Sequence, residues 1–430
     1  MGAVLAIKVL VFPCGSEIGL EIHAALKYSK AVEVYGASSV SDHGEFVYAR
    51  YRQIAAHVHS DDFIEQLNRL IDEWQIDILL PAHDSVILKL AQCRAQLRAP
   101  AAVPELDVAS ICRNKNATYA HLAHCDFVPA SIQGLAEAYP IFAKPAVGQG
   151  SQGAEIIHER ERHQQLLASS VEYVFSEYLP GVEYTIDCIS DGSGRLLHAS
   201  PRERGRVKSG ISVRTQPAQL EPEVGAMASV IAQTFAFKGG WFFQVKRDRQ
   251  GRAKLLEIAP RIAGSMGLSR NLGINYPLLS IYAHLGMAFS VLPQDYPLLM
   301  DRALKNCFRA DLAYERVYLD LDDTLVINGK VNSLLMALLY QWQGRGVAIV
   351  LITRHAQCPR ATLDQHRICL DLFSEIIHIV DGAPKSRYIT PRCAALFIDD
   401  SYRERLDVSQ VCGIPVFDLD AVEQLLDWRA

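Results

Sequence analysis

The sequence predicts an α/β multidomain protein. Its 430 residues are too many for one compact core, so two to four domains are expected. Half of the residues are hydrophobic (50%) and 21% are charged, which is typical of a soluble folded protein and not of a disordered one. Short apolar runs alternate with helical patterns near both ends of the chain, as in βαβ units of a parallel sheet.

Charge and cysteine content exclude several classes of protein. The formal net charge of -5 gives no reason to expect a nucleic-acid partner. The ten cysteines show no Cys-x-x-Cys spacing, which favours free thiols in a reducing compartment. The apolar residues 4–12 are interrupted by Lys8 and lack a cleavage site, so they predict a strand and not a signal peptide. No run approaches the ~18 apolar residues of a membrane-spanning helix. We therefore expect a cytoplasmic protein with no membrane partner.

Residues 1 to about 105 alternate strands and helices. A strand over residues 7–12 leads into a turn with Gly15 and Ser16, and a strand over residues 76–81 ends just before Asp84. Ligands of parallel sheets bind at the carboxyl ends of strands, so these residues are expected to face a substrate cleft. A tight turn and an exposed helix cap explain each of them equally well.

A glycine-rich loop follows a strand at residues 141–145. The strand delivers Lys144, and Gly148, Gly150 and Gly153 follow together with Ser151. Glycines let backbone N–H groups close over polyphosphate oxygens, and the lysine adds a point charge. The loop is not a Walker A motif, because no Gly-Lys-Ser/Thr closes it. A glycine-rich hairpin turn is the alternative.

Two later pairs of strands complete a nucleotide pattern. Residues 174–187 predict a strand, a Pro-Gly turn and a strand, a hinge whose backbone bonds an adenine edge while Glu183 reaches the ribose hydroxyls. A plain turn is the alternative. Strands over residues 240–248 and 254–261 are expected to pair, which places Gln244 beside Glu257 for a hard cation. Arg261 follows near the expected γ-phosphate or acyl phosphate.

In this order, the segments resemble the ATP-grasp superfamily, on its carbamoyl-phosphate-synthase and amino-acid-ligase side. The resemblance covers roughly residues 5–290 and implies a pre-ATP-grasp α/β domain over residues 1–105 and an ATP-grasp α+β domain over residues 106–300. It implies magnesium ligands at Gln244 and Glu257, and a catalytic Arg261 that faces the acyl phosphate. The ATP-binding residues that it implies are Lys115, Lys144, Gly148, Gly150, Ser151, Gly153, Glu177, Tyr178, Leu179 and Glu183.

The chemistry that this resemblance implies is ligation. A carboxylate attacks the γ-phosphate of ATP, and an amine displaces phosphate from the acyl phosphate to form an amide. Arg202, Arg204 and Arg214 lie on the segment that lines the acceptor pocket in the family and suggest an anionic substrate, such as an α-amino acid; arginines on a mobile surface hairpin are the alternative. One departure is Ala259, where many members carry an asparagine metal ligand.

The last 120 residues predict a second site. Three apolar strands each end in polar groups, and such ends meet at one edge of a parallel sheet. The polar groups are an acidic cluster after the first strand, Thr353 after the second and an acidic pair after the third, with Lys385 opening a helix between the last two. Clustered carboxylates repel one another unless a cation is bound. A chance acidic strand end is the alternative.

These four motifs resemble the haloacid dehalogenase (HAD) superfamily of phosphatases, over residues 312–430. The resemblance implies a Rossmann-like domain in which Asp320 is the nucleophile, Asp322 the general acid/base, and Thr353 and Lys385 bind the phosphoryl group. The magnesium ligands that it implies are Asp320, Asp322, Asp399 and Asp400. Asp320 and Thr353 are 33 residues apart, and Thr353 and Lys385 are 32 apart, which leaves no room for a cap domain.

The sequence thus predicts a bifunctional enzyme that uses ATP and Mg2+ and acts on a carboxylate, an amine and a phosphomonoester. Two alternatives stay open: a working phosphatase regulated by a non-catalytic ATP-binding domain, and a nucleotide-sensing scaffold. A homodimer is the default expectation for such an enzyme.

Overall fold

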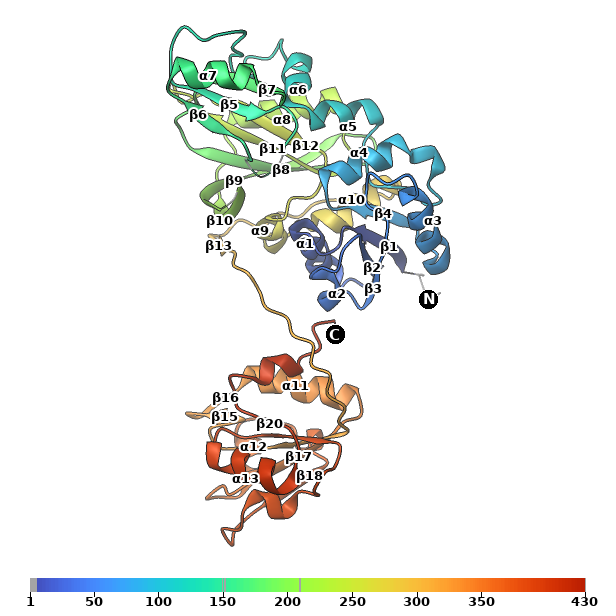
Figure 1. The fold of residues 1–430 in the computed structure, drawn as a ribbon, viewed down its shortest axis with the longest axis vertical. Coiled ribbons are helices and arrows are strands. Elements are labelled where there is room, and N and C mark those ends of the chain that lie inside the picture. Colours follow the sequence, from blue (N-terminus) through green and yellow to red (C-terminus); the bar gives the residue numbers. More distant parts are fainter. Residues whose placement is uncertain (1–5, 149, 151, 209, 430) are drawn as a thin grey trace. The chain divides into compact units, whose positions relative to one another are not determined.

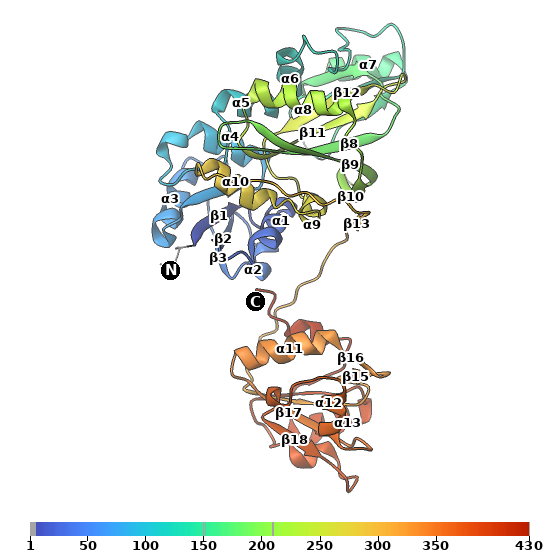
Figure 2. The same ribbon diagram turned by 180° about the vertical axis from the view of Figure 1, so that it is seen from behind.

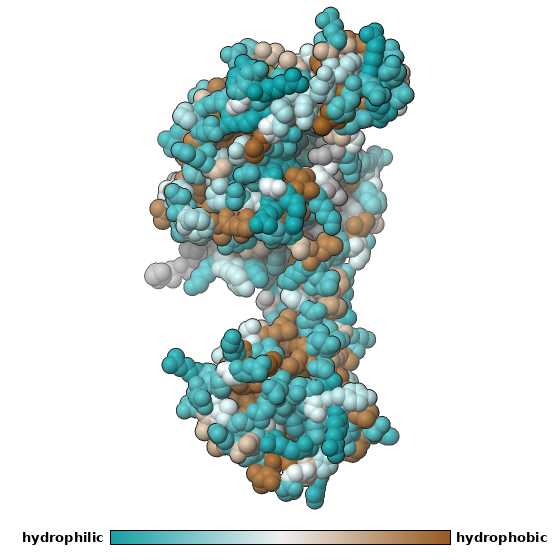
Figure 3. All heavy atoms as spheres, turned by 90° about the vertical axis from the view of Figure 1, so that its left-hand side faces the viewer, coloured by the Kyte–Doolittle hydropathy of each residue, from teal (hydrophilic) through white to brown (hydrophobic). Residues whose placement is uncertain are grey.

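The computed structural model describes residues 6–148, 150, 152–208 and 210–429. The chain divides into two compact units, Met1–Leu304 (unit 1) and Lys305–Ala430 (unit 2), and each is described by itself (Figure 1). None of the ten cysteines is in a disulfide bond. Over the described part of the chain, no helix combines the length and the apolar character that a membrane crossing requires. On the face in Figure 3, hydrophobic side chains are scattered among a larger number of hydrophilic ones.

Unit 1 begins with a four-stranded parallel sheet in the order β3-β2-β1-β4. Its strands are β1 (Ile7–Phe12), β2 (Val32–Ser38), β3 (Arg50–Gln53) and β4 (Ile78–Pro81). The accompanying helices are α1 (Glu17–Leu26), α2 (Gly44–Val47), α3 (Phe63–Trp74), α4 (Asp84–Gln92), η1 (Arg94–Gln96), α5 (Leu106–Arg113) and α6 (Lys115–His121). Ser16 is the N-cap of α1, where its hydroxyl accepts the Gly19 N–H at 3.0 Å. The cap alternative therefore describes Ser16 in this structure.

A small antiparallel sheet in the order β6-β5-β7 follows. It consists of β5 (Ile141–Pro145), β6 (Glu155–Ile157) and β7 (Tyr173–Glu177), and α7 (Arg160–Leu167) lies between β6 and β7 in the chain. Ile141, Ala143 and Phe175 are buried together on one side of this sheet, with Leu166 of α7. The sheet thus has a small core of its own and carries Lys144 and the start of the glycine-rich loop.

The largest sheet of unit 1 has the order β12-β11-β8-β9-β10-β13. Its strands are β8 (Glu183–Ser190), β9 (Leu196–Lys208), β10 (Ile211–Pro217), β11 (Gly239–Arg247), β12 (Ala253–Ala259) and β13 (Met300–Asp301), and the neighbouring helices are α8 (Pro222–Phe235), α9 (Gly267–Asn271) and α10 (Tyr276–His284). Helix α8 lies along one face of this sheet (Figure 2). Trp241, Phe243 and Val245 are buried in the core that the sheet forms with this helix. Because side chains alternate along a strand, Gln244 and Lys246 face the opposite side.

Unit 2 is a five-stranded parallel sheet in the order β18-β17-β14-β19-β20. Its strands are β14 (Arg316–Leu319), β17 (Ala348–Thr353), β18 (Glu375–His378), β19 (Ala395–Ile398) and β20 (Val416–Phe417). The remaining elements are the hairpin of β15 (Val326–Ile327) and β16 (Lys330–Val331), the helices α11 (Ser333–Gly344), α12 (Pro359–Gln365) and α13 (Tyr402–Cys412), and the short helical turns η2 (Leu370–Leu372), η3 (Lys385–Tyr388) and η4 (Val422–Leu425).

The strand order of unit 2 places a crevice at its centre. The chain passes from β14 to β17 on one side and later returns to β19 on the other side of β14. Parallel sheets bind ligands at such a switch point, beside the carboxyl ends of the strands. Between β14 and α11, the described chain holds only the β15–β16 hairpin, so nothing the size of a cap domain is inserted there. The helix predicted to open at Lys385 is a single 3₁₀ turn, η3.

Candidate functional site

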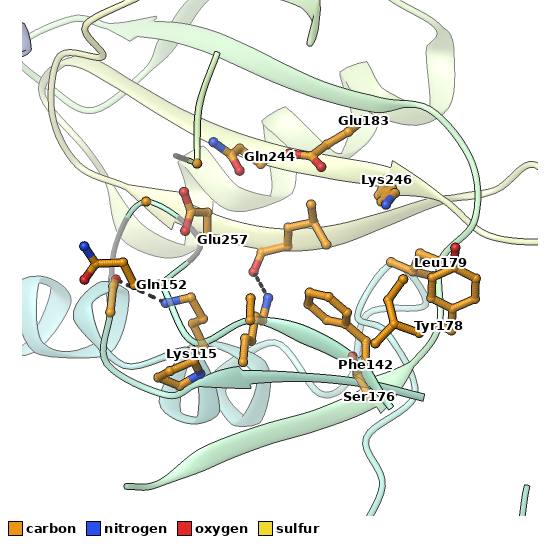
Figure 4. A pocket seen from close by; sticks show the side chains of 18 of the residues that line it. Lys115, Phe142, Gln152, Ser176, Tyr178, Leu179, Glu183, Gln244, Lys246 and Glu257 are labelled. Atoms are coloured by element: carbon orange, nitrogen blue, oxygen red, sulfur yellow. Dashed lines mark hydrogen bonds between the residues drawn. The ribbon is translucent and has the colours of Figure 1, made fainter. Parts of the chain in front are cut away.

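A cavity of about 160 Å³ in unit 1 collects most of the residues predicted to bind ATP (Figure 4). Its lining includes Lys115, Lys144, Gly148, Gly150, Glu177, Tyr178, Leu179 and Glu183. Gly153 has a positive φ of 71° and lies next to Pro145, which lines the cavity. Ser151 lies outside the described residues. The cavity lies between the small sheet, which supplies Lys144, and the large sheet, which supplies Glu183.

Lys144 is buried in the wall of this cavity. Its Nζ donates to the Tyr119 hydroxyl at 2.8 Å and to the Leu256 carbonyl oxygen at 2.6 Å. Burial disfavours the charged form and lowers the lysine pKa to about 8, although Glu257 and Glu183 act in the opposite direction. The side chain therefore carries a proton at neutral pH but loses it more readily than an exposed lysine does.

Two further cations hold the glycine-rich loop. Lys115 Nζ and Arg113 Nη1 donate to the Gly148 carbonyl oxygen, at 3.4 and 3.2 Å. Burial lowers the pKa of Lys115, and the nearby Glu257 opposes that shift. Lys115 opens α6, where the Asn114 side chain caps the helix. The start of α6 therefore places a positive charge beside the loop that is expected to cover the phosphates.

The predicted metal pair lies side by side. Gln244 on β11 and Glu257 on β12 are direct cross-strand partners, and both side chains line the cavity (Figure 4). An amide oxygen and a carboxylate are ligands that suit Mg2+, so these residues fit that ion. Ala259 pairs with Phe242 and is packed into the core, so it offers no third oxygen.

The three arginines predicted to bind substrate are separated by the structure. Arg202 is 2% exposed and its guanidinium is bonded to Asp187, at 2.8 and 3.1 Å, while Ser269 donates to the same carboxylate. A guanidinium enclosed in this way is held by the protein and does not line the described cavity. Arg214 lies on β10 with an exposed side chain, opposite Asp301 of β13.

Arg204 does line the first cavity, where it forms an ion pair with Glu183, the residue predicted to bind the ribose hydroxyls. Its Nη1 lies 2.8 Å from Glu183 Oε1, and its Nη2 donates to the Gly210 carbonyl oxygen at 2.8 Å. A Cβ at Gly210 would lie 2.0 Å from backbone atoms of Gly150, so the β9–β10 turn lies directly against the glycine-rich loop. Only a residue without a side chain fits between these two segments.

Arg261 lies in a second cavity of about 60 Å³ that adjoins the first. Its Nη2 donates to Asp84 Oδ2 at 3.0 Å, which joins the end of β12 to the start of α4. Burial alone would raise the pKa of Asp84, but the guanidinium of Arg261 holds it below its ordinary value. Arg113 also lines this cavity, and Lys115, Gly148, Gly150 and Glu257 line both cavities. The prediction that Asp84 faces a cleft agrees with this position.

Sequence reasoning missed Lys246, which lines the first cavity, and Tyr119, which is bonded to a lysine of that cavity. Tyr119 bonds Lys144, and Lys246 projects into the cavity from β11, opposite Glu183 in the strand register (Figure 4). The alternation along β11 places Lys246 on the same face as Gln244, a signal that was available. No local pattern marks Tyr119, because its contact with Lys144 spans 25 residues.

Unit 2 brings a lysine between two carboxylates at the centre of its sheet. Lys385 Nζ lies 2.6 Å from Asp320 Oδ1 and 2.6 Å from Asp399 Oδ2. Burial raises the pKa of Asp320 to about 6; Lys385 opposes this shift and Asp399 adds to it. These side chains line a cavity of about 210 Å³ together with Thr353, which is fully buried.

Three carboxylates of this cavity can hold one cation. Oxygen atoms of Asp320, Asp399 and Asp400 all lie within 4.8 Å of one another. The Ser401 N–H donates to Asp399 Oδ1 at 2.8 Å, and the Thr324 hydroxyl donates to Asp400 Oδ1 at 3.2 Å, which orients both side chains. Three carboxylates form an oxygen donor set that fits Mg2+.

The structure does not bring the Asp322 side chain into this group of three. Both of its carboxylate oxygens lie near Nδ1 of His355, at 2.8 and 2.9 Å. The position of Asp322 therefore differs from its predicted place among the metal ligands. Asp322 still lines the same cavity as Asp320 and Lys385. His355 was not predicted, because one histidine after a strand has no motif spacing.

Comparisons with known proteins find that part of unit 1 is similar to an ATP-grasp family and to carbamoyl phosphate synthases. Residues 169–302 match the family model described as "ATP-grasp in the biosynthetic pathway with Ter operon". The carbamoyl phosphate synthase large chain of Clostridium perfringens (strain SM101 / Type A) is 30% identical over 146 residues, which are 30% of this chain and 14% of that protein. The same protein of Thermomicrobium roseum is 28% identical over 172 residues, which are 37% of this chain and 16% of that protein. The chain thus matches about a seventh of the length of these relatives.

Solved structures show the same fold. An L-amino acid ligase from Bacillus licheniformis has a TM-score of 0.52 at 18% identity, covering 65% of this chain and 74% of its own. The N5-carboxyaminoimidazole synthetase from Staphylococcus aureus complexed with ADP has a TM-score of 0.56 at 16% identity, covering 70% of this chain and 82% of its own. At these identities, the likeness shows the fold alone, which is a mixed α/β fold.

The pKa of Lys144 predicts how nucleotide affinity depends on pH. If the ammonium holds phosphate, the affinity for ATP falls as the pH rises through about 8, by up to about tenfold per pH unit. In Lys144→Met, the affinity is low at every pH and this dependence disappears. Isothermal titration calorimetry between pH 6.5 and 9.5 measures both. Equal affinity of the unaltered protein across this range would contradict the assignment.

Proposed function

We propose that the protein is a bifunctional enzyme, in which the ATP-grasp unit ligates a carboxylate to an amine and unit 2 hydrolyses a phosphomonoester. The observation that supports the ligase activity best is the set of residues that line the first cavity of unit 1. A buried lysine ammonium, a glycine-rich loop and a cross-strand pair of oxygen ligands, Gln244 and Glu257, share its walls. These groups suit a nucleoside triphosphate and its magnesium ion.

The ligase reaction uses groups that already lie around the two adjoining cavities. Lys115 and Lys144 hold the triphosphate, while Arg261 and Arg113 attract the carboxylate substrate into the second cavity. A carboxylate oxygen attacks the γ-phosphorus, and the bond to the departing ADP breaks. The amine nitrogen then attacks the acyl carbon, loses a proton and expels phosphate. Gln244 and Glu257 would hold Mg2+, which would supply positive charge to offset that of the phosphate oxygens.

The second activity rests on the lysine and carboxylates of unit 2. Asp320 attacks phosphorus as the alcohol leaves with a proton from Asp322, and water, deprotonated by Asp322, then releases phosphate from the aspartyl-phosphate. Thr353 and Lys385 hold the phosphoryl oxygens in both steps. The Asp320, Asp399 and Asp400 oxygens would hold Mg2+, which would supply positive charge to offset that of the phosphoryl group. With no cap domain inserted after β14, the cleft admits a bulky phosphomonoester.

Ligation is tested in the Asp320→Asn variant, whose phosphatase site is disabled. With Mg2+ and ATP, we expect ADP release that requires one carboxylate and one amine from a panel that includes amino acids. Adding Lys144→Met to this variant should abolish that release, because the buried ammonium no longer holds the phosphates. ATP binding without ADP release across the panel would instead favour a regulatory nucleotide site.

Phosphatase activity is tested on the full chain with p-nitrophenyl phosphate and Mg2+. Asp320→Asn should lower turnover by more than about 10³-fold, because the nucleophile is lost. Asp371→Asn, at an exposed carboxylate of η2, is the matched control and should leave turnover unchanged. Removal of Mg2+ with EDTA should abolish hydrolysis reversibly. If neither unit turns over, a nucleotide-sensing scaffold is the better account.

A further inference from the structure

His355 connects the general acid/base predicted for unit 2 to a neighbouring helix. Its Nδ1 lies 2.8 and 2.9 Å from the two carboxylate oxygens of Asp322, and its Nε2 lies 2.7 Å from the hydroxyl oxygen of Thr362 on α12. The imidazole is 15% exposed, whereas the Asp322 side chain is 52% exposed. The half-exposed Asp322 carboxylate is thus bonded to the mostly buried imidazole of His355.

The backbone of His355 is fixed as well. Its N–H donates to the Thr353 hydroxyl at 3.1 Å, and its carbonyl oxygen accepts a bond of 2.8 Å from Nε2 of His378. Thr353 ends β17 and His378 ends β18, so two adjacent strands fix the backbone position from which the His355 side chain extends. The segment that presents the Thr353 hydroxyl to the cavity therefore also presents the ring to Asp322.

The two ring bonds are mutually compatible. When Nδ1 carries the proton and donates to the carboxylate, Nε2 of a neutral imidazole has a lone pair and accepts the Thr362 hydroxyl. Both ring nitrogens then have partners, and rotation of the ring would break both bonds. Asp322 is followed by Asp323, which has a positive φ of 51°. Without His355, the half-exposed Asp322 carboxylate would sample several rotamers.

We propose that His355 is a positioning residue that holds Asp322 where it can exchange a proton with the substrate. The inference rests on the proposed phosphatase activity of unit 2. While the Asp320 Oδ–P bond forms and the ester P–O bond breaks, the Asp322 carboxyl gives its proton to the leaving oxygen. While water then forms a new O–P bond and the Asp320–P bond breaks, Asp322 takes a proton from that water. His355 gains and loses no proton in this cycle.

The leaving group distinguishes positioning from a structural role. An alkyl phosphate needs a proton on its leaving oxygen, whereas p-nitrophenolate leaves with little help. In His355→Ala, we expect kcat for β-glycerol phosphate to fall about 30-fold and kcat for p-nitrophenyl phosphate to fall less than about threefold. The KM for both substrates and inhibition by inorganic phosphate should stay within about twofold, because the phosphoryl-binding Thr353 and Lys385 are unchanged.

Conservative variants sharpen the test. His355→Asn places an amide N–H near the position of Nδ1 and should recover most of kcat for the alkyl phosphate, whereas His355→Gln should recover less. Thr362→Val, which leaves Nε2 without its hydroxyl partner, should show a weaker form of the same substrate-dependent loss. His366→Ala at the end of α12 is the matched control and should leave both substrates unaffected. Thermal unfolding measures whether each variant is folded.

Three outcomes would overturn the inference. An equal loss of kcat for both substrates, or a raised KM, would assign His355 to the integrity of the cavity. Unchanged hydrolysis of the alkyl phosphate in His355→Ala would exclude any role in proton transfer. If the unaltered chain hydrolyses neither substrate with Mg2+, the proposed phosphatase activity itself fails, and the inference fails with it; the first two outcomes leave that activity standing.

Discussion

The bonds of Lys144 link the walls of the first cavity of unit 1. Its ammonium on β5 reaches the Tyr119 hydroxyl on α6 and the Leu256 carbonyl on β12, so one buried group joins the small sheet, a helix and the large sheet. A buried charge is costly unless it is hydrogen-bonded, and these partners supply part of that stabilisation. The remaining donor capacity of the ammonium is available to a ligand. The walls of the cavity and its affinity for anions therefore depend on the same side chain.

Unit 2 also contains buried charges, but here the cluster consists of carboxylates around one lysine. Burial raises the pKa of the Asp320 and Asp399 carboxyls. Asp399 adds to the shift of Asp320 and Asp400 adds to that of Asp399, while Lys385 lies between Asp320 and Asp399 and opposes both shifts. Asp400 adds a third carboxylate that the lysine does not reach in this arrangement. A divalent cation among these oxygens would remove the rest of the repulsion. The charge arrangement of the cavity is thus suited to a metal and a phosphoryl group.

Sequence patterns predicted several of the strands and the residues that lie along them. The apolar run at residues 7–12 has the bounds of β1, and alternation along β11 correctly predicted that Gln244 and Glu257 are neighbours. The structure differs where a contact joins distant segments. Arg202 was predicted to bind substrate because the sequence does not reveal its hydrogen bonds to Asp187. The bond between Lys144 and the Leu256 carbonyl oxygen, which spans 112 residues, was not predictable either. His355 was missed for the same reason, since its partners Asp322 and Thr362 come from two different segments.

The central claim is that ATP and a magnesium ion share the cavity between Lys144 and the Gln244–Glu257 pair. The most direct measurement is calorimetric binding of the non-hydrolysable analogue AMP-PNP to the Asp320→Asn chain, with Mg2+ and with EDTA. The account predicts that Mg2+ raises the affinity by about tenfold or more and that Glu257→Ala, introduced into this chain, abolishes the increase. An affinity that is the same with and without Mg2+, or an increase that survives Glu257→Ala, would contradict it.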